Sequence, residues 1–371
     1  YIYLTPSTLA LINMFLFIAN MGHICSVRAK NTVMGSLIYP ILVGAISLSL
    51  SVSVVGQSGI AIPGSPKGDL PIELLQSRAY CRSLERQIES IKEDFPSLGI
   101  EVLAAEASWK SSPFAVGCNA IEQNILQQTG EKGRAMLREM DDKTWAEALK
   151  FTKVATVAEA KKFLALVDRR AKGEIEVPMV RGNLLWHYKP FREKPEKEIA
   201  RGYIQKITHT ATIGREIKFE IPMSWKSGKS PNKGLMFFRN CYGHGNVWMT
   251  VTVIPTTNAA GQPISAQKNF EAYSEELLQA DYQTLGIELT SFLKTKVNGM
   301  PALLFTRAQP YEQLGQRATR AAQVIRVFFG DHTMSFQINT LGPEGTKTAA
   351  DRIRKNEALF KMIGGSLQVA E

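Results

Sequence analysis

The segment VWMTVTVI, from Val247 to Ile254, gives the clearest sign of how the C-terminal half folds. Every second residue from Val247 to Val253 is apolar, and the residues between them are Trp or Thr. A period of two places alternate side chains on opposite faces of a strand, so the segment predicts a strand with one buried face. The segment IKFEI, from Ile217 to Ile221, alternates in the same way and predicts a second strand.

Turn residues predict further strands around these two. Asn298-Gly299 separates LTSFLKTKV from MPALLFTRA, and Gly330-Asp331 separates VIRVFF from HTMSFQIN. Both residue pairs tolerate the positive φ of tight hairpin turns. Apolar residues at helical spacing predict helices from Ala266 to Tyr282, with Leu277 on the apolar side, and from Ala349 to Leu367. The expected arrangement is an antiparallel sheet backed by helices, in an α+β protein.

The chain before this sheet predicts a helical bundle over residues 71–172. Apolar residues of the first helix recur at spacings of three, four and seven. They are Leu74, Cys81, Leu84, Ile88, Ile91 and Phe95. A second helix begins at Pro113, and the spacing from Thr156 to Glu159 predicts a capping box at the start of a later helix.

The boundary between the two domains is predicted at residues 173–200. This charged segment contains three prolines, which indicates a linker with one short strand. Residues 69–181 contain 17 basic and 18 acidic residues, whereas residues 182–371 contain 24 and 16. The excess of positive charge therefore belongs to the second domain, expected at residues 201–371.

The first 70 residues predict an export signal and a linker. Met21 begins a stretch with Arg28 and Lys30, and the run from Ser36 to Gly56 then has no charge. This order is that of a secretory signal peptide, with residues 1–56 as leader and 57–70 as linker. The alternative is a retained membrane anchor, because about 20 apolar residues can cross a bilayer. Either way, a periplasmic or secreted location is expected.

The C-terminal half resembles the PsbP-like fold family from about residue 206 to residue 369. The most specific segments are FEIPMSWK, with Pro222 three residues before Trp225, and the Asn298-Gly299-x-x-Ala302 hairpin, followed by a closing helix that ends in GGSLQV. This family includes the extrinsic PsbP subunit of photosystem II, a Ran-binding nuclear import factor, DcrB-type envelope proteins and Eag chaperones. The resemblance implies a non-enzymatic binding or assembly module whose partners differ widely between members.

A weak candidate for chemistry is the Gly-rich segment that contains Cys241 and His244. A Cys/His pair can form a thiolate nucleophile or supply two metal ligands, which would make the protein a hydrolase or a metal enzyme. The residue that orients a nucleophile and the further ligands of a metal are missing at any recognisable spacing. A structural role in a loop is therefore favoured, with no catalytic or metal-binding residue and no cofactor.

The basic residues of the second domain suggest a different partner. Lys226, Lys229 and Lys233 form the densest set and could bind an anionic surface, although a solvated, solubilising face is favoured. Aromatic residues do not alternate with these lysines as single-strand binding requires, so no nucleic-acid partner is expected.

Two cysteines on the apolar stripes of the helical domain predict a disulfide. Cys81 and Cys118 are both aimed at the interior of the bundle, and Cys241 would remain unpaired. Two buried free thiols are the alternative. Together with what the PsbP-like resemblance implies, these patterns predict an exported, non-enzymatic binding or assembly protein, such as a chaperone-like module that contacts an unknown protein in the bacterial envelope.

Overall fold

The computed structural model describes residues 72–152, 154–209, 215–228, 235–243, 245–257, 261–313 and 316–370. The predicted leader and the first linker lie outside the described residues, so export stays a prediction. Among the described helices, none combines the length and the hydrophobicity that a membrane crossing requires.

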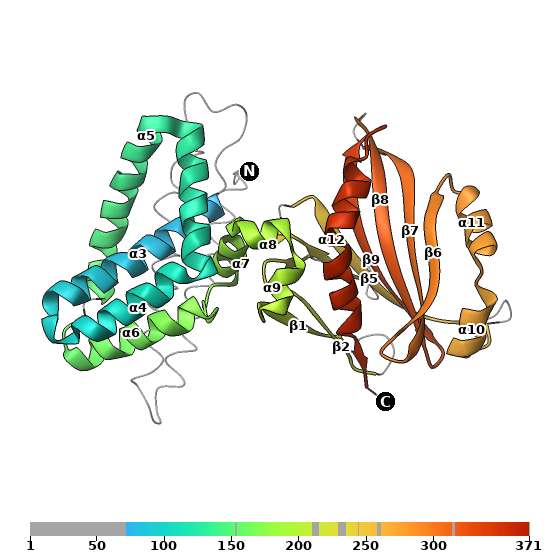
Figure 1. The fold of residues 1–371 in the computed structure, drawn as a ribbon, viewed down its shortest axis with the longest axis horizontal. Helices are drawn as coiled ribbons and strands as arrows, with labels where there is room; N and C mark the ends of the chain where they lie inside the picture. The colour runs from blue at the N-terminus through green and yellow to red at the C-terminus, as the bar shows by residue number, and fades with distance from the viewer. Residues whose placement is uncertain are drawn as a thin grey trace, which may run out of the picture.

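The described chain begins with a helical domain (Figure 1). Its elements are α3 (Ile72–Asp94), η1 (Pro96–Leu98), α4 (Gly99–Ser111), α5 (Pro113–Thr152, interrupted at Gly130) and α6 (Val157–Ala171). The predicted capping box is confirmed at α6, where the Glu159 amide donates to Thr156 Oγ1 at 3.2 Å and the Thr156 amide donates to Glu159 Oε2 at 3.1 Å. The core of the domain includes the fully buried Trp109 and Phe114.

The segment predicted as a linker contains three short helices instead of a strand. They are α7 (Pro178–His187), α8 (Lys189–Glu193) and α9 (Glu196–Ala200). Prolines open the first turns of α7 and α8, where a missing amide hydrogen has no cost, so the prolines begin helices here. Leu184 and Phe191 join the core of the helical domain, whereas Ile199 packs against the core of the sheet domain. The segment therefore connects two cores (Figure 1).

Two antiparallel sheets are described in the second domain. Its elements are β1 (Ile204–His209), β2 (Ile217–Pro222), β3 (Lys226–Gly228), β4 (Leu235–Arg239), η2 (Cys241–Gly243), β5 (Val247–Pro255), α10 (Ala266–Ala272), α11 (Glu275–Gln283), β6 (Glu288–Val297), β7 (Met300–Gln313), β8 (Gln316–Phe329), β9 (His332–Pro343), α12 (Thr348–Gly365) and β10 (Gln368–Val369). The strand orders are β1-β2-β10 and β3-β4-β5-β9-β8-β7-β6. Both predicted hairpins are confirmed: Asn298, Gly299 and Gly330 have positive φ at the turns after β6 and β8.

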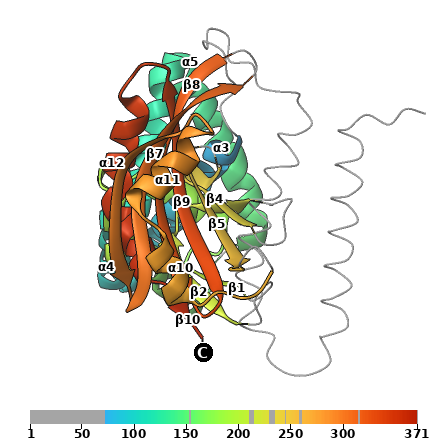
Figure 2. The same ribbon diagram turned by 90° about the vertical axis from the view of Figure 1, so that its right-hand side faces the viewer.

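The large sheet is covered differently on its two faces. Ile325 and Val327 of β8 pack in one core with α12 and the small sheet, whereas Val324 and Phe328 pack on the other face with α10 and α11. Figure 2 shows the sheet between these helices. The α+β class with an antiparallel sheet backed by helices is confirmed.

The helix predicted from Ala266 to Tyr282 is two helices. Ser274 interrupts it, because the Ser274 hydroxyl accepts a hydrogen bond from the Leu277 amide at 3.2 Å and caps α11. The interruption rotates the second helix, so Leu277, predicted on the apolar side, is 47% exposed, and Leu278 is buried in its place.

Candidate functional site

The two domains meet at the η2 loop between β4 and β5. Cys241 and Tyr242 both have positive φ there, a conformation that costs energy for residues with a side chain. The Tyr242 amide donates to the Ser224 carbonyl at 2.8 Å. Its ring lies against Gly182 of α7, where an added Cβ would come within 2.4 Å of the ring. The absence of a side chain at Gly182 therefore permits this contact between the domains.

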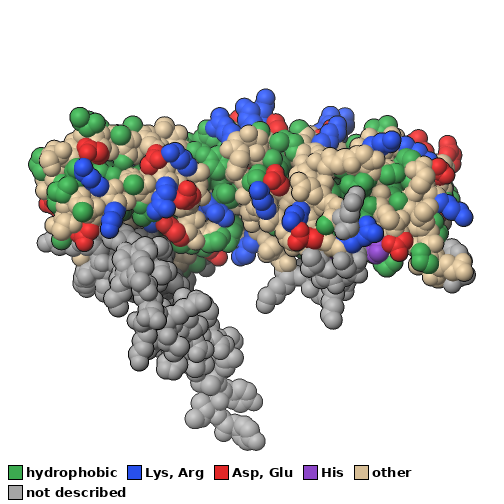
Figure 3. Space-filling model, turned by 90° about the horizontal axis from the view of Figure 1, so that it is seen from below, with side chains coloured by type: hydrophobic (Ala, Val, Ile, Leu, Met, Phe, Trp, Pro, Cys, Tyr) green, Lys and Arg blue, Asp and Glu red, His purple; other side chains and the backbone are tan. Residues whose placement is uncertain are grey.

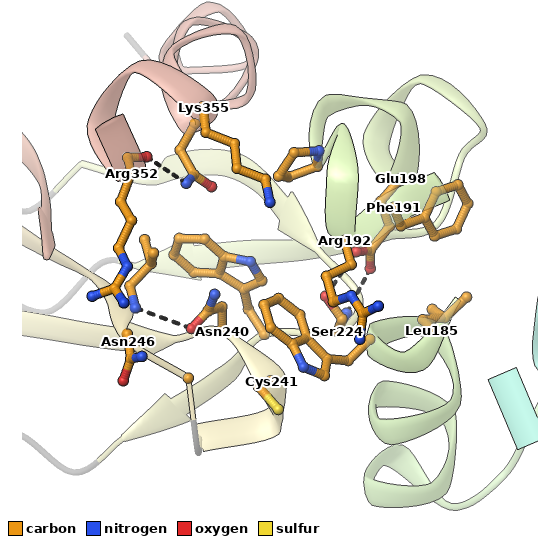
Figure 4. A pocket seen from close by; sticks show the side chains of 16 residues that line it. Leu185, Phe191, Arg192, Glu198, Ser224, Asn240, Cys241, Asn246, Arg352 and Lys355 are labelled. Carbon is orange, nitrogen blue, oxygen red and sulfur yellow. Dashed lines mark hydrogen bonds between the residues drawn. The ribbon is translucent and has the colours of Figure 1, made fainter. Parts of the chain in front are cut away.

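A cavity of about 320 Å³ opens beside this loop (Figure 4). Its lining comes from helices of the connecting segment, from the ends of β2 and β5, from the η2 loop and from α12. The lining includes Leu185, Trp186, Phe191, Arg192, Glu198, Ser224, Trp225, Asn240, Cys241, Arg352 and Lys355. We call this cavity the junction pocket.

Among the described lining residues, three carry cationic side chains: Arg192 from α8, and Arg352 and Lys355 from α12. Arg352 donates to the carbonyl oxygen of Leu341. In the described part of the chain, none of the three forms an ion pair with a carboxylate. Arg192 and Lys355 are exposed, so their charged groups are free to meet a ligand.

Among the described residues that line the pocket, Glu198 is the only one with a carboxyl group, and its side chain is buried. Its two oxygens accept hydrogen bonds from the Ser224 amide at 2.6 Å and from the Ser224 hydroxyl at 2.7 Å. Burial raises the pKa of Glu198 to about 7, although these hydrogen bonds favour the charged form. The bonds connect α9 to the end of β2 and fix the wall of the pocket.

Cys241 lines the same pocket, but its chemistry does not suit a nucleophile. Burial raises the pKa of its thiol to about 12, against the opposing effect of Arg192 and Arg239. A thiol with this pKa is protonated at neutral pH, whereas nucleophilic cysteines act as thiolates. His244 lies outside the described residues. In the ranges that the structure covers, no group of three or more His, Cys, Asp or Glu side chains could hold a metal ion.

The predicted basic patch is described only at Lys226. Its ammonium lies 5.0 Å from the centroid of the Tyr242 ring, at the junction between the domains. Lys229 and Lys233 lie outside the described residues. On the face drawn in Figure 3, Lys and Arg side chains are interspersed with Asp and Glu side chains along the molecule.

Cys81 and Cys118 lie together in the core of the helical domain as free thiols. Both are fully buried. Burial, followed by a hydrogen bond to Cys118, raises the pKa of the Cys81 thiol. The predicted proximity of Cys81 and Cys118 is therefore observed. The disulfide between them stays a prediction.

Most residues of the junction pocket were not identified from the sequence. Arg352 and Lys355 are three positions apart on the predicted closing helix, which places them on one helical face. Arg192 and Glu198 belong to the segment that was interpreted as a linker. These residues are far apart in the sequence, and no sequence pattern indicated that they would line one pocket.

No family model matches this sequence, and no curated protein matches it. Among solved structures, the cyanobacterial PsbP of Synechocystis is similar at 13% identity over 45% of this chain and 93% of that chain, with a TM-score of 0.28. The Ran-binding protein Mog1p of Saccharomyces cerevisiae is similar at 9% identity over 44% of this chain and 95% of that chain, with a TM-score of 0.30.

A protein from Bacteroides thetaiotaomicron is also similar, at 11% identity over 42% of this chain, with a TM-score of 0.24; the match spans 45% of that protein's length. The matched structures include PsbP and a Ran-binding protein, two members of the family that the C-terminal half was expected to resemble. Identities and TM-scores this low carry no conclusion about what the chain binds.

Proposed function

We propose that the protein is an exported, non-enzymatic binding protein that holds an anionic group of a partner protein in the junction pocket. The observation that carries this proposal is that Arg192, Arg352 and Lys355 line one cavity and that none of them forms an ion pair in the described ranges. Uncompensated positive charges around a cavity attract an anion and strengthen its hydrogen bonds.

The chemistry of the lining supports a carboxylate-bearing segment as the ligand. Guanidinium groups present two parallel donors that match the two oxygens of a carboxylate. Trp186 and Trp225 supply apolar surface beside the charges, and a small number of polar groups in a largely apolar cavity is typical of binding sites. Because the lining comes from both domains, binding there would also fix how the domains are held together.

Comparative affinity capture tests this function. The baits are the full chain, the variant Arg192→Gln/Lys355→Gln, and the control Arg354→Gln/Lys361→Gln, which removes the same charge from exposed positions of α12 outside the pocket. Each charge-assisted hydrogen bond contributes about 1.5 to 3 kcal/mol, so the pocket variant should retain a specific envelope partner at least about tenfold less well.

The control bait should capture that partner as well as the unaltered chain does, because exposed ion pairs contribute little. Equal recovery of the same proteins on all three baits would contradict the proposal.

A further inference from the structure

A second cationic feature lies on the opposite side of the large sheet. Arg307 of β7 and Arg320 and Arg326 of β8 point away from α12, because they alternate with residues that face it. We call these three residues the arginine cluster. Helices α10 and α11 pack against β6, β7 and β8 on this face, and the cluster extends from beneath them toward β9 and β5.

The arginine cluster is bonded to neutral groups. Arg307 Nη2 donates to Gln337 Oε1 at 3.1 Å. Arg320 donates to Asn339 Oδ1 from Nε at 3.2 Å and from Nη2 at 2.8 Å. Within the described ranges, no carboxylate pairs with any of the three arginines, and Nε of both Arg307 and Arg326 is buried without a hydrogen-bond partner.

Aromatic rings hold the guanidinium groups in place. The guanidinium carbon of Arg320 lies 5.7 Å from the Trp248 ring centroid, that of Arg307 lies 5.2 Å from Tyr282, and that of Arg326 lies 5.2 Å from Tyr273. Stacking of this kind stabilises a cation and fixes the plane of its donors.

The arginine cluster destabilises the folded protein when no counter-ion is bound. Burial, followed by the neighbouring charge of Arg307, lowers the pKa of Arg320. Like charges that are partly removed from water repel each other and lose hydration. Each of the three arginines keeps part of its surface exposed, so an anion that reaches the cluster would cancel this repulsion.

We propose that the arginine cluster binds the carboxylates of an acidic peptide segment of a partner protein, which lies across this face of the sheet. The three arginines are half-buried and held against aromatic rings. A flat lipid surface contacts only side chains that project from a protein, whereas a peptide can enter between side chains and reach half-buried groups. The amide groups of Gln337 and Asn339 beside them suit hydrogen bonds with a peptide backbone. This surface is distinct from the junction pocket, which lies on the α12 side of the sheet.

A labelled peptide tests the proposal on the full chain. Fluorescein-labelled hexaglutamate is titrated at low salt with the unaltered protein, with Arg307→Gln/Arg320→Gln, with the control Arg354→Gln/Lys361→Gln, and with the junction-pocket variant Arg192→Gln/Lys355→Gln. Loss of two guanidinium groups should weaken binding at least about tenfold, and the Arg354→Gln/Lys361→Gln control should stay within about twofold of the unaltered protein. An equal loss in the Arg354→Gln/Lys361→Gln control, or a dissociation constant above about 1 mM for the unaltered protein, overturns the proposal.

The junction-pocket variant Arg192→Gln/Lys355→Gln separates the two proposals. If that variant alone loses the peptide, the peptide occupies the junction pocket and the arginine cluster is not its site. A second measurement needs no substitution: phenylglyoxal modifies accessible arginines, and mass spectrometry locates the product. Hexaglutamate should slow the modification of Arg307 and Arg320 in the unaltered protein. Protection by phosphatidylglycerol vesicles and not by the peptide would assign this face to a membrane and refute the proposal.

Discussion

Replacing Glu198 by Gln should remove a dependence of stability on pH that the junction pocket creates. The Glu198 carboxyl is buried between α9 and the end of β2, with Ser224 as its hydrogen-bond partner. Gln has nearly the same shape and can accept from the Ser224 amide while it donates to the Ser224 hydroxyl. The substitution therefore keeps the hydrogen bonds to Ser224 and removes the carboxyl group that titrates.

The direction of the effect follows from the raised pKa. Folded Glu198 has a pKa of about 7, and its ordinary value is 4.5. Below pH 4.5 both states hold the proton and the full stabilisation is present. As the pH rises from 4.5 to 7, the unfolded chain releases the proton while the folded chain retains it, so the stabilisation is lost. Between pH 5 and pH 8 this loss amounts to about 2.5 kcal/mol.

Urea unfolding followed by tryptophan fluorescence measures the effect, because Trp186 and Trp225 line the same pocket. Glu198→Gln should match the unaltered protein at pH 5 and be more stable by about 2.5 kcal/mol at pH 8. The control Glu196→Gln removes a carboxylate from the same helix and should follow the pH dependence of the unaltered protein. Parallel pH profiles for the unaltered protein and Glu198→Gln would show that Glu198 does not titrate with a raised pKa in the folded protein.

Three other outcomes are expected. Gly182→Ala should destabilise the junction by about 1 to 3 kcal/mol, because its Cβ would meet the Tyr242 ring, and limited proteolysis should then cut between the domains sooner; an unchanged digestion pattern contradicts this contact. Non-reducing peptide mapping of the exported protein should recover Cys81 linked to Cys118, a bridge that would add about 3 to 4 kcal/mol, and free thiols at both positions would exclude it. Mass spectrometry should place the mature N-terminus between Gly56 and Ile62, whereas a mass that includes the charge-free run would indicate a retained anchor.

The sequence predicted those parts of the fold that depend on local periodicity. The alternation in β2 and β5 and the Asn298-Gly299 hairpin are local patterns, because strand faces and tight turns are set by neighbouring residues. The break at Ser274 was missed because a serine inside an apolar helical pattern can be either an interior residue or a cap.

The junction pocket and the arginine cluster could not be predicted from the sequence. Glu198 becomes part of a site only because α9 packs at the end of β2, and Arg352 joins it from a helix more than 150 positions later. The arginine cluster depends on the register that brings β7, β8 and β9 together, and register follows from the packed core. Both sites depend on tertiary contacts between distant segments. The sequence composition therefore indicated only that the second domain is basic.

Photo-crosslinking from the pocket tests most directly the claim that the junction pocket binds a partner. Benzoylphenylalanine replaces Trp186, which lines the pocket, or Ile100, which is 83% exposed on α4, in the full chain expressed in its native host. Irradiation should link position 186, and not position 100, to one partner, and Arg192→Gln/Lys355→Gln should abolish that product while Arg354→Gln/Lys361→Gln preserves it. The same products from both positions, or a product from position 186 that survives Arg192→Gln/Lys355→Gln, would contradict the account.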